Sequence, residues 1–169
     1  MPWSIKRVEP GRYKVADVFE GLEDSLTLTK VYPDAAQRLA VVRDTPLVIS
    51  TEDMYGYVDD DSGTIHFGHK HLTESDANTV FLDILHELVH VKQLKDGANL
   101  YDKRYAYVDR PTEIEAYALI VEEARKMGMA EDKIAEYLFV EWASPEDHLR
   151  LCRRLGVNPA GRRRPPPNR

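Results

Sequence analysis

The sequence predicts a small, mostly helical domain of the α+β class. Apolar residues recur at helical spacing in several long segments, whereas the runs that favour strands are short and lie before the longest helix. The hydrophobic fraction of 43% and the charged fraction of 31% are typical of a globular protein. A chain of 169 residues fits one domain with a core of its own, which we expect over residues 1–160.

The first third of the chain contains short elements. Residues 11–30 alternate loosely and indicate a short helix followed by a strand. Residues 32–34, Tyr-Pro-Asp, open a helix that runs to Arg43, and Pro46 ends it. Residues 47–50 are apolar and β-branched, which predicts a strand.

A hairpin or meander is predicted next. Residues 59–63, Asp-Asp-Asp-Ser-Gly, are a turn signal between the two runs 55–58 and 64–68. The acidic run is only superficially like a calcium loop, because it lacks the alternating ligands and the closing glutamate. We therefore interpret these aspartates as turn residues.

The longest predicted helix follows the hairpin. Residues 73–76, Thr-Glu-Ser-Asp, offer a capping box at its start, and Gly97 is a C-cap glycine at its end. Between them, apolar residues at helical spacing predict a helix packed on the core. These residues are Val80, Phe81, Ile84, Leu85, Leu88, Val91 and Leu94.

Further helices complete the chain. Residues 98–110 are a loop rich in tyrosine and charge, 111–128 predict a helix, and another helical region begins near Ala130. Ser144 is the expected cap of a final short helix. This helix carries Cys152, the single cysteine, which excludes an intrachain disulfide and is expected to be an inert packed thiol.

Charge and hydropathy bound the partners and the compartment. The formal net charge of -6 makes nucleic acid an unexpected partner for the body of the fold. The basic, proline-rich tail, residues 161–169, is expected to be disordered, with a docking arm or a plug in an acidic cleft as the alternative. No apolar run approaches the roughly 18 residues of a membrane span. The N-terminus lacks a signal-peptide core, so we expect a cytoplasmic protein.

One short motif carries chemistry. The string His86-Glu87-Leu88-Val89-His90 lies inside the longest predicted helix. Residues four apart are neighbours on one helix face, so the two imidazoles can hold a single zinc ion. The glutamate between them can reach a water on that ion and act as general base. The motif therefore predicts a zinc hydrolase.

A third protein ligand is needed, and the glutamates of the following helix are the best candidates. Glu113 begins a stripe that is otherwise Ala, Tyr, Ile, Ala and Met, where a lone carboxylate is costly unless it is paired or bound to metal. Glu115 lies on a solvated face, three residues after Thr112, with which it can form a capping box. We favour Glu113 and keep Glu115 as the alternative. In the alternative interpretation, neither carboxylate binds metal, and both only interact favourably with the positive N-terminal end of the helix.

Other histidines fit less well. A third histidine downstream, as in metzincins, is excluded because position 93 is Gln93 and position 96 is Asp96. His66, His69 and His71 are interpreted as surface or hydrogen-bonding residues. His148 is a distant candidate ligand with no motif around it.

The His86–His90 string, followed by Glu113-Ile114-Glu115-Ala116, resembles the gluzincin pattern. It is similar to the soluble minigluzincins and to the catalytic core of membrane-bound prenyl-protein proteases, over roughly residues 64–125. The resemblance implies a zincin-like domain with a short antiparallel sheet packed on the active-site helix. It also implies that Glu113 is the third zinc ligand, while Tyr117 stands where that family has an aspartate.

The resemblance also implies a mechanism. His86, His90 and Glu113 would hold zinc, which lowers the pKa of a bound water toward about 7, and Glu87 would act as general base. Residues 64–68 would be an edge strand that an extended peptide can join. An oxyanion donor could come from the loop tyrosines, and Asp83 could orient a ligand imidazole or face water. These tyrosines are Tyr101, Tyr105 and Tyr107.

Three functions remain open at this point. The first is a zinc metallopeptidase that acts on a peptide or protein substrate. The second is a zinc-bearing regulatory or binding module with narrow or no proteolysis. The third is a metal-free helical interaction protein. The sequence favours the first, because a scaffold would not require Glu87, and it does not determine the oligomeric state.

Overall fold

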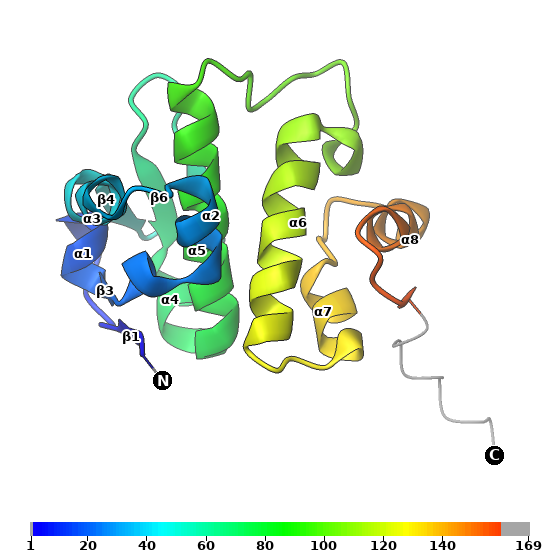
Figure 1. Ribbon diagram of the computed structural model, residues 1–169, viewed down its shortest axis with the longest axis horizontal. Coiled ribbons are helices and arrows are strands. Elements are labelled where there is room, and N and C mark those ends of the chain that lie inside the picture. Colours follow the sequence, from blue (N-terminus) through cyan, green and yellow to red (C-terminus); the bar gives the residue numbers. More distant parts are fainter. Residues whose placement is uncertain (1, 160–169) are drawn as a thin grey trace. The chain divides into compact units, whose positions relative to one another are not determined.

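The computed structural model describes residues 2–159 and is drawn in Figure 1. These residues are mostly helical and contain two small sheets, which confirms the predicted α+β class. The chain divides into two compact units, Met1–Leu100 and Tyr101–Arg169. The predicted basic tail, residues 161–169, falls outside the described residues.

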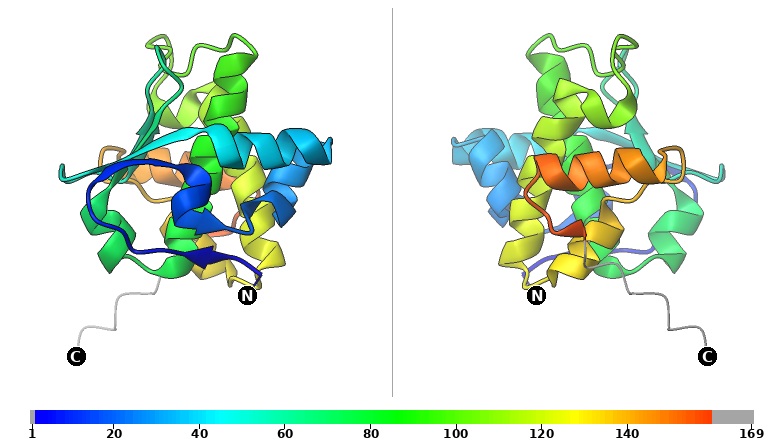
Figure 2. Two further views of the ribbon diagram at one scale, coloured as in Figure 1. Left: turned by 90° about the vertical axis from the view of Figure 1, so that its left-hand side faces the viewer. Right: turned by 90° about the vertical axis from the view of Figure 1, so that its right-hand side faces the viewer.

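The first unit contains both sheets (Figure 2, left). Strands β1 (Ser4–Ile5) and β3 (Phe19–Glu20) form a two-stranded antiparallel sheet. The larger sheet has the order β2-β4-β6-β5 and is mixed, because its central pair is parallel. Its strands are β2 (Gly11–Lys14), β4 (Pro46–Ser50), β5 (Gly56–Val58) and β6 (Ile65–Gly68).

The predicted edge strand is wrong. Residues 64–68 correspond to β6, which lies between β4 and β5 in the sheet. Leu47 of β4 pairs with Ile65, and on the other side Gly56 of β5 pairs with Phe67. Both Ile65 and Phe67 are fully buried, as suits an interior strand. The edge on this side is therefore β5.

The hairpin turn is confirmed. β5 and β6 are antiparallel, and the Asp59 carboxylate between them accepts hydrogen bonds from the backbone N–H groups of Asp61 (2.9 Å) and Ser62 (3.1 Å). These bonds favour the ionised form and lower the pKa of Asp59. Gly63 closes the turn with a φ of 73°, which favours glycine.

Short helices surround the strands of this unit. The helix and strand predicted for residues 11–30 are α1 (Val15–Val18) and β3, and the structure adds β2 before them and α2 (Leu26–Val31) after them. A 3-10 turn, η1 (Leu22–Asp24), precedes α2. The helix predicted after Pro33 is α3 (Ala35–Asp44), whose cap Asp34 accepts a hydrogen bond from the Gln37 N–H at 2.9 Å.

The start of the motif helix differs from the prediction. Thr73 belongs to a separate helix, α4 (His69–Glu74), where its hydroxyl donates to the His69 carbonyl at 2.9 Å. The motif helix, α5 (Ala77–Lys95), is capped instead by Asp76, which accepts from the Thr79 N–H. Its end is as predicted, because Gly97 follows with a φ of 87°.

α5 is the central helix of the first unit. It contacts α2 and β5, and most of its residues are buried. At its N-terminal end Trp3 stacks on Phe81, with ring centroids 4.2 Å apart and planes inclined by 8°. The motif is therefore carried by a helix that is surrounded by core, as predicted.

The second unit is helical (Figure 2, right). It contains the 3-10 turn η2 (Tyr107–Asp109) and the helices α6 (Pro111–Lys126), α7 (Glu131–Tyr137) and α8 (Pro145–Arg154). The predicted cap of α8 is confirmed, since Ser144 accepts a hydrogen bond from the Asp147 N–H at 3.1 Å. Cys152 is fully buried, as expected of a packed thiol.

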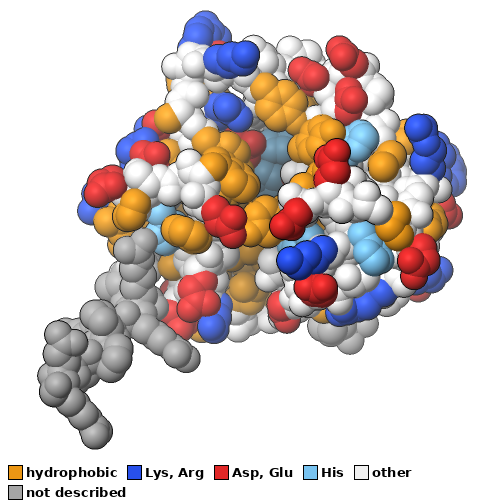
Figure 3. Space-filling model, turned by 180° about the vertical axis from the view of Figure 1, so that it is seen from behind, with side chains coloured by type: hydrophobic (Ala, Val, Ile, Leu, Met, Phe, Trp, Pro, Cys, Tyr) orange, Lys and Arg blue, Asp and Glu red, His pale blue; other side chains and the backbone are white. Residues whose placement is uncertain are grey.

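A charged network joins η2 to α8. The Asp109 carboxylate accepts from Nε and Nη2 of Arg150, at 3.0 and 2.8 Å, and also pairs with Arg154 at 3.0 Å. These contacts lower the pKa of Asp109, chiefly through the hydrogen bonds with Arg150. Elsewhere, positive and negative side chains are interspersed, as the face in Figure 3 shows. Every helix within residues 2–159 is too short or too polar to span a bilayer.

Candidate metal centre

The two histidines of the motif lie on one face of α5. Their ring centroids are 4.6 Å apart and their planes are inclined by 83°. Each residue is only 5% exposed. The four-residue spacing in a helix brings the rings together, and burial in the core restricts their rotamers.

The orientation of His90 is set by a residue that the sequence analysis did not select. The Nδ1 of His90 is 2.7 Å from the Oε1 of Gln93, and both side chains are buried. An amide oxygen only accepts, so Nδ1–H is the donor and Nε2 keeps its lone pair. A hydrogen bond of this kind is how proteins orient a metal-binding imidazole. In the sequence, the signal for this contact is that Gln93 follows His90 by three residues, which places both side chains on one face of the helix.

Glu87 is also buried, although it is a carboxylate. Glutamate is rarely buried unless it is paired or has a task, because removing its charge from water is costly. It directly follows His86 on α5, between two stretches of apolar core. This placement suits a proton acceptor beside the histidine pair.

The structure separates the two candidate glutamates of α6. Glu113 is 4% exposed, whereas Glu115 is exposed to solvent. The capping box predicted for Thr112 and Glu115 is absent. The helix begins at Pro111 as predicted, so its N-cap is Arg110 rather than Thr112, and no side chain caps its start.

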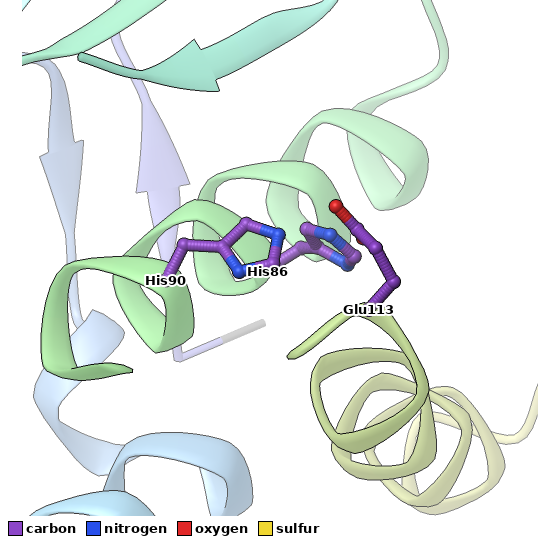
Figure 4. Close-up of side chains that lie close together, drawn as sticks. All are labelled: His86, His90 and Glu113. Carbon is purple, nitrogen blue, oxygen red and sulfur yellow. The ribbon is translucent and has the colours of Figure 1, made fainter. Parts of the chain in front are cut away.

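Three of the predicted ligands form a group. Ligand atoms of His86, His90 and Glu113 all lie within 4.8 Å of one another, and their side chains point toward one another in Figure 4. Two imidazole nitrogens and one carboxylate oxygen are a donor set that suits zinc. No protein-family model, curated protein or solved structure matches the chain.

The remaining histidines have other surroundings. His66 stacks on Tyr57, and His148 donates from Nε2 to the carbonyl of Ala135 at 2.7 Å. His69 is partly exposed at the start of α4. None of these belongs to a potential metal-binding group among residues 2–159.

His71 links α4 to α5. Its Nε2 is 2.7 Å from Oδ2 of Asp83, and its Nδ1 is 2.7 Å from Oγ of Ser75. Asp83 precedes His86 by one helical turn, and the imidazole that it contacts here, that of His71, is not one of the predicted ligands. The result is a hydrogen-bonded anchor for the N-terminal half of α5.

The acidic run of the hairpin is a second potential group. Carboxylate oxygens of Asp59, Asp60 and Asp61 also lie within 4.8 Å of one another, but Asp60 and Asp61 are exposed. Asp59 is the turn residue described above. Exposed acidic groups of this kind are common without a metal, and the turn accounts for them.

The loop tyrosines are now distinguished from one another. Tyr105 is exposed and Tyr101 partly so. Tyr107 is instead held by α6, because its hydroxyl is 2.8 Å from that of Tyr117. Tyr117 follows Glu113 by one helical turn, on the same buried stripe. The Tyr107–Tyr117 pair therefore places two phenols next to the glutamate in the second unit.

Proposed function

We propose that this protein is a zinc-dependent metallopeptidase of the gluzincin type that hydrolyses peptide bonds. The observation that carries the proposal is the buried group of His86, His90 and Glu113, with Glu87 beside the first histidine. Three protein ligands leave one position for water or substrate, which distinguishes catalytic from structural zinc sites.

The donor set favours zinc over other common metals. Magnesium and calcium take mainly oxygen ligands, whereas two imidazoles and a carboxylate suit zinc. The hydrogen bond that Nδ1–H of His90 donates to Gln93 supports this assignment, because it leaves Nε2 of His90 available as a ligand. Both histidines are on one buried helix, so little ordering is needed on binding.

Each residue then has a role. When bound, zinc supplies Lewis-acid chemistry, polarising the carbonyl and making a water acidic enough to react near neutral pH. Glu87 accepts the proton as water attacks the carbonyl carbon, and then delivers it to the leaving amine. Gln93 keeps His90 in one tautomer throughout. β5 is one of the two edge strands of the larger sheet, and an extended substrate can join an edge of this kind.

The test is to measure metal and hydrolysis on the same protein samples. Native mass spectrometry of the purified, untagged protein should find one zinc per chain, and His86→Ala should find none. His69→Ala is the matched control, because this histidine lies outside the group, and should keep its zinc. Glu87→Gln should retain zinc and lose cleavage of a peptide library.

Each other outcome has a defined meaning. Hydrolysis by Glu87→Gln at the parent rate would refute the proposed mechanism. Zinc without hydrolysis in the parent would point to a regulatory or binding module. Absence of zinc after supplementation would refute the metal centre and favour an interaction protein.

A further inference from the structure

Arg110 stands out among the arginines of the second unit. It is the N-cap residue of α6 and precedes Glu113 by three residues. Its guanidinium carbon lies 5.6 Å from the centroid of the Tyr107 ring. Its Nε is buried and has no hydrogen-bond partner among residues 2–159. A positive group is therefore held over an aromatic ring with part of its donor capacity unused.

The other partly buried arginines of the described residues are satisfied. Arg38 donates to the backbone carbonyls of Glu23, Tyr32 and Pro33. Arg150 is bound by two aspartates, Asp109 and Asp147. Since buried donors in native proteins are paired as a rule, an exception calls for a functional explanation.

Asp102, an acidic residue near Arg110, is not its hydrogen-bond partner. The positive charge of Arg110 contributes to the lowered pKa of Asp102, but the largest cause is the hydrogen bond with Arg104. The Asp102 carboxylate is occupied by Arg104, whose Nε and Nη2 donate to it. Asp102 therefore does not take up the donor capacity of the Arg110 guanidinium.

The backbone adds to the attraction for an anion. α6 is 16 residues long, and no side chain caps its N-terminus. The positive end of a helix favours negative charge in its first turn. A guanidinium presents planar donors that match a carboxylate, and stacking over a ring fixes its orientation.

We propose that Arg110 is a specificity-determining residue that binds a carboxylate of the peptide substrate; this rests on the proposed function. Arg110 is the N-cap residue of α6, and Glu113 lies in the first turn of the same helix. An extended peptide advances about 3.3–3.6 Å per residue. In this proposal, the carboxylate bound by Arg110 therefore lies within a few residues of a peptide bond beside Glu113. It is either the free C-terminus or an Asp or Glu side chain.

The experiment compares matched peptides. Cleavage sites are first found with a peptide library. Each good substrate is then made in two matched pairs. In the first pair the C-terminus is free or amidated, and in the second the Asp and Glu residues are kept or replaced by Asn and Gln. For the parent, removing the recognised carboxylate should lower kcat/KM by roughly tenfold or more, as expected of a lost charge-assisted pair. Which of the two changes has this effect identifies the source of the carboxylate.

Variants assign the preference to Arg110. Arg110→Gln should cleave the two forms of each peptide equally, mainly through a raised KM for the carboxylate form. Arg110→Lys keeps the charge without the fork and should retain part of the preference. Arg153→Gln, an exposed arginine of α8, controls for net charge and should behave as the parent. Zinc content and thermal unfolding of the variants should match the parent.

A binding measurement separates the two proposals. In the metal-free protein, fluorescence anisotropy of the labelled peptide should show tighter binding of the carboxylate form, and Arg110→Gln should remove that difference. Equal cleavage of both peptide forms by the parent, or an unchanged preference in Arg110→Gln, would overturn the role of Arg110. Absence of any cleavage by the zinc-loaded parent would instead overturn the proposed function.

Discussion

The Nδ1 of His90 donates a hydrogen bond of 2.7 Å to the Oε1 of Gln93, three residues further along the same helix. Both side chains are buried, so water does not compete for either atom. A short helical spacing thus determines which nitrogen of His90 can bind a metal. The first prediction follows from this pair.

Gln93→Leu should weaken zinc binding while leaving the three ligands in place. Without the acceptor, Nδ1 of His90 loses its partner and the preference for one tautomer. Loss of such an outer contact typically lowers metal affinity by about 10–100-fold. Competition with a chromophoric chelator measures the change. Lys95→Gln, an exposed residue of the same helix, is the control, and an unchanged affinity in Gln93→Leu would contradict this role.

Glu113→Gln and Glu115→Gln should differ sharply. The first residue belongs to the buried group and the second is exposed. A neutral amide at position 113 removes the anionic ligand, so zinc content should fall and hydrolysis should be lost. Glu115→Gln should retain both. Zinc measured by native mass spectrometry in the two variants decides the matter, and the reverse pattern would transfer the ligand role to Glu115.

Asp109→Asn should destabilise the second unit at neutral pH but not in acid. Hydrogen bonds from Arg150 lower the pKa of Asp109 in the folded protein. A lowered pKa adds stability above the unfolded pKa of about 4, and this stability is lost as the pH falls through the folded value. The expected cost at pH 7 is roughly 0.5–1.5 kcal/mol.

Urea unfolding at pH 7 and near pH 3 tests this sign. The difference in the free energy of unfolding between the parent and Asp109→Asn should shrink as the pH falls. Glu146→Gln removes an exposed carboxylate of α8 and should have little effect at either pH. An equal difference at both pH values would show that Asp109 stabilises through packing rather than charge.

The helices could be predicted from the sequence because their signals are local. Asp34, Ser144 and Gly97 mark helix ends through bonds or φ angles that involve only the nearest residues. The start of α5 was misplaced for the same local reason. Thr73 and Asp76 are both residue types that favour an N-cap, but Thr73 lies inside the separate helix α4 and only Asp76 caps α5.

The sheet order could not be predicted in this way. The parallel pairing of β4 with β6 joins Leu47 to Ile65 and depends on packing between segments far apart in the sequence. For the site, the spacing of the His-Glu-x-x-His string selected His86 and His90, and Glu113 was selected because a carboxylate interrupts an apolar helix stripe. Arg110 interrupts no such pattern, and its unused donor becomes visible only in three dimensions.

The stacking of Trp3 on Phe81 gives the protein a built-in optical probe. The chain has two tryptophans, and the other, Trp142, contacts the ring of Tyr107 in the second unit. Trp142→Phe leaves emission from the first unit alone, and Trp3→Phe leaves emission from the second. Urea titrations of these two variants report separately on each half of the chain, so coincident curves would indicate one cooperative transition and separated curves two.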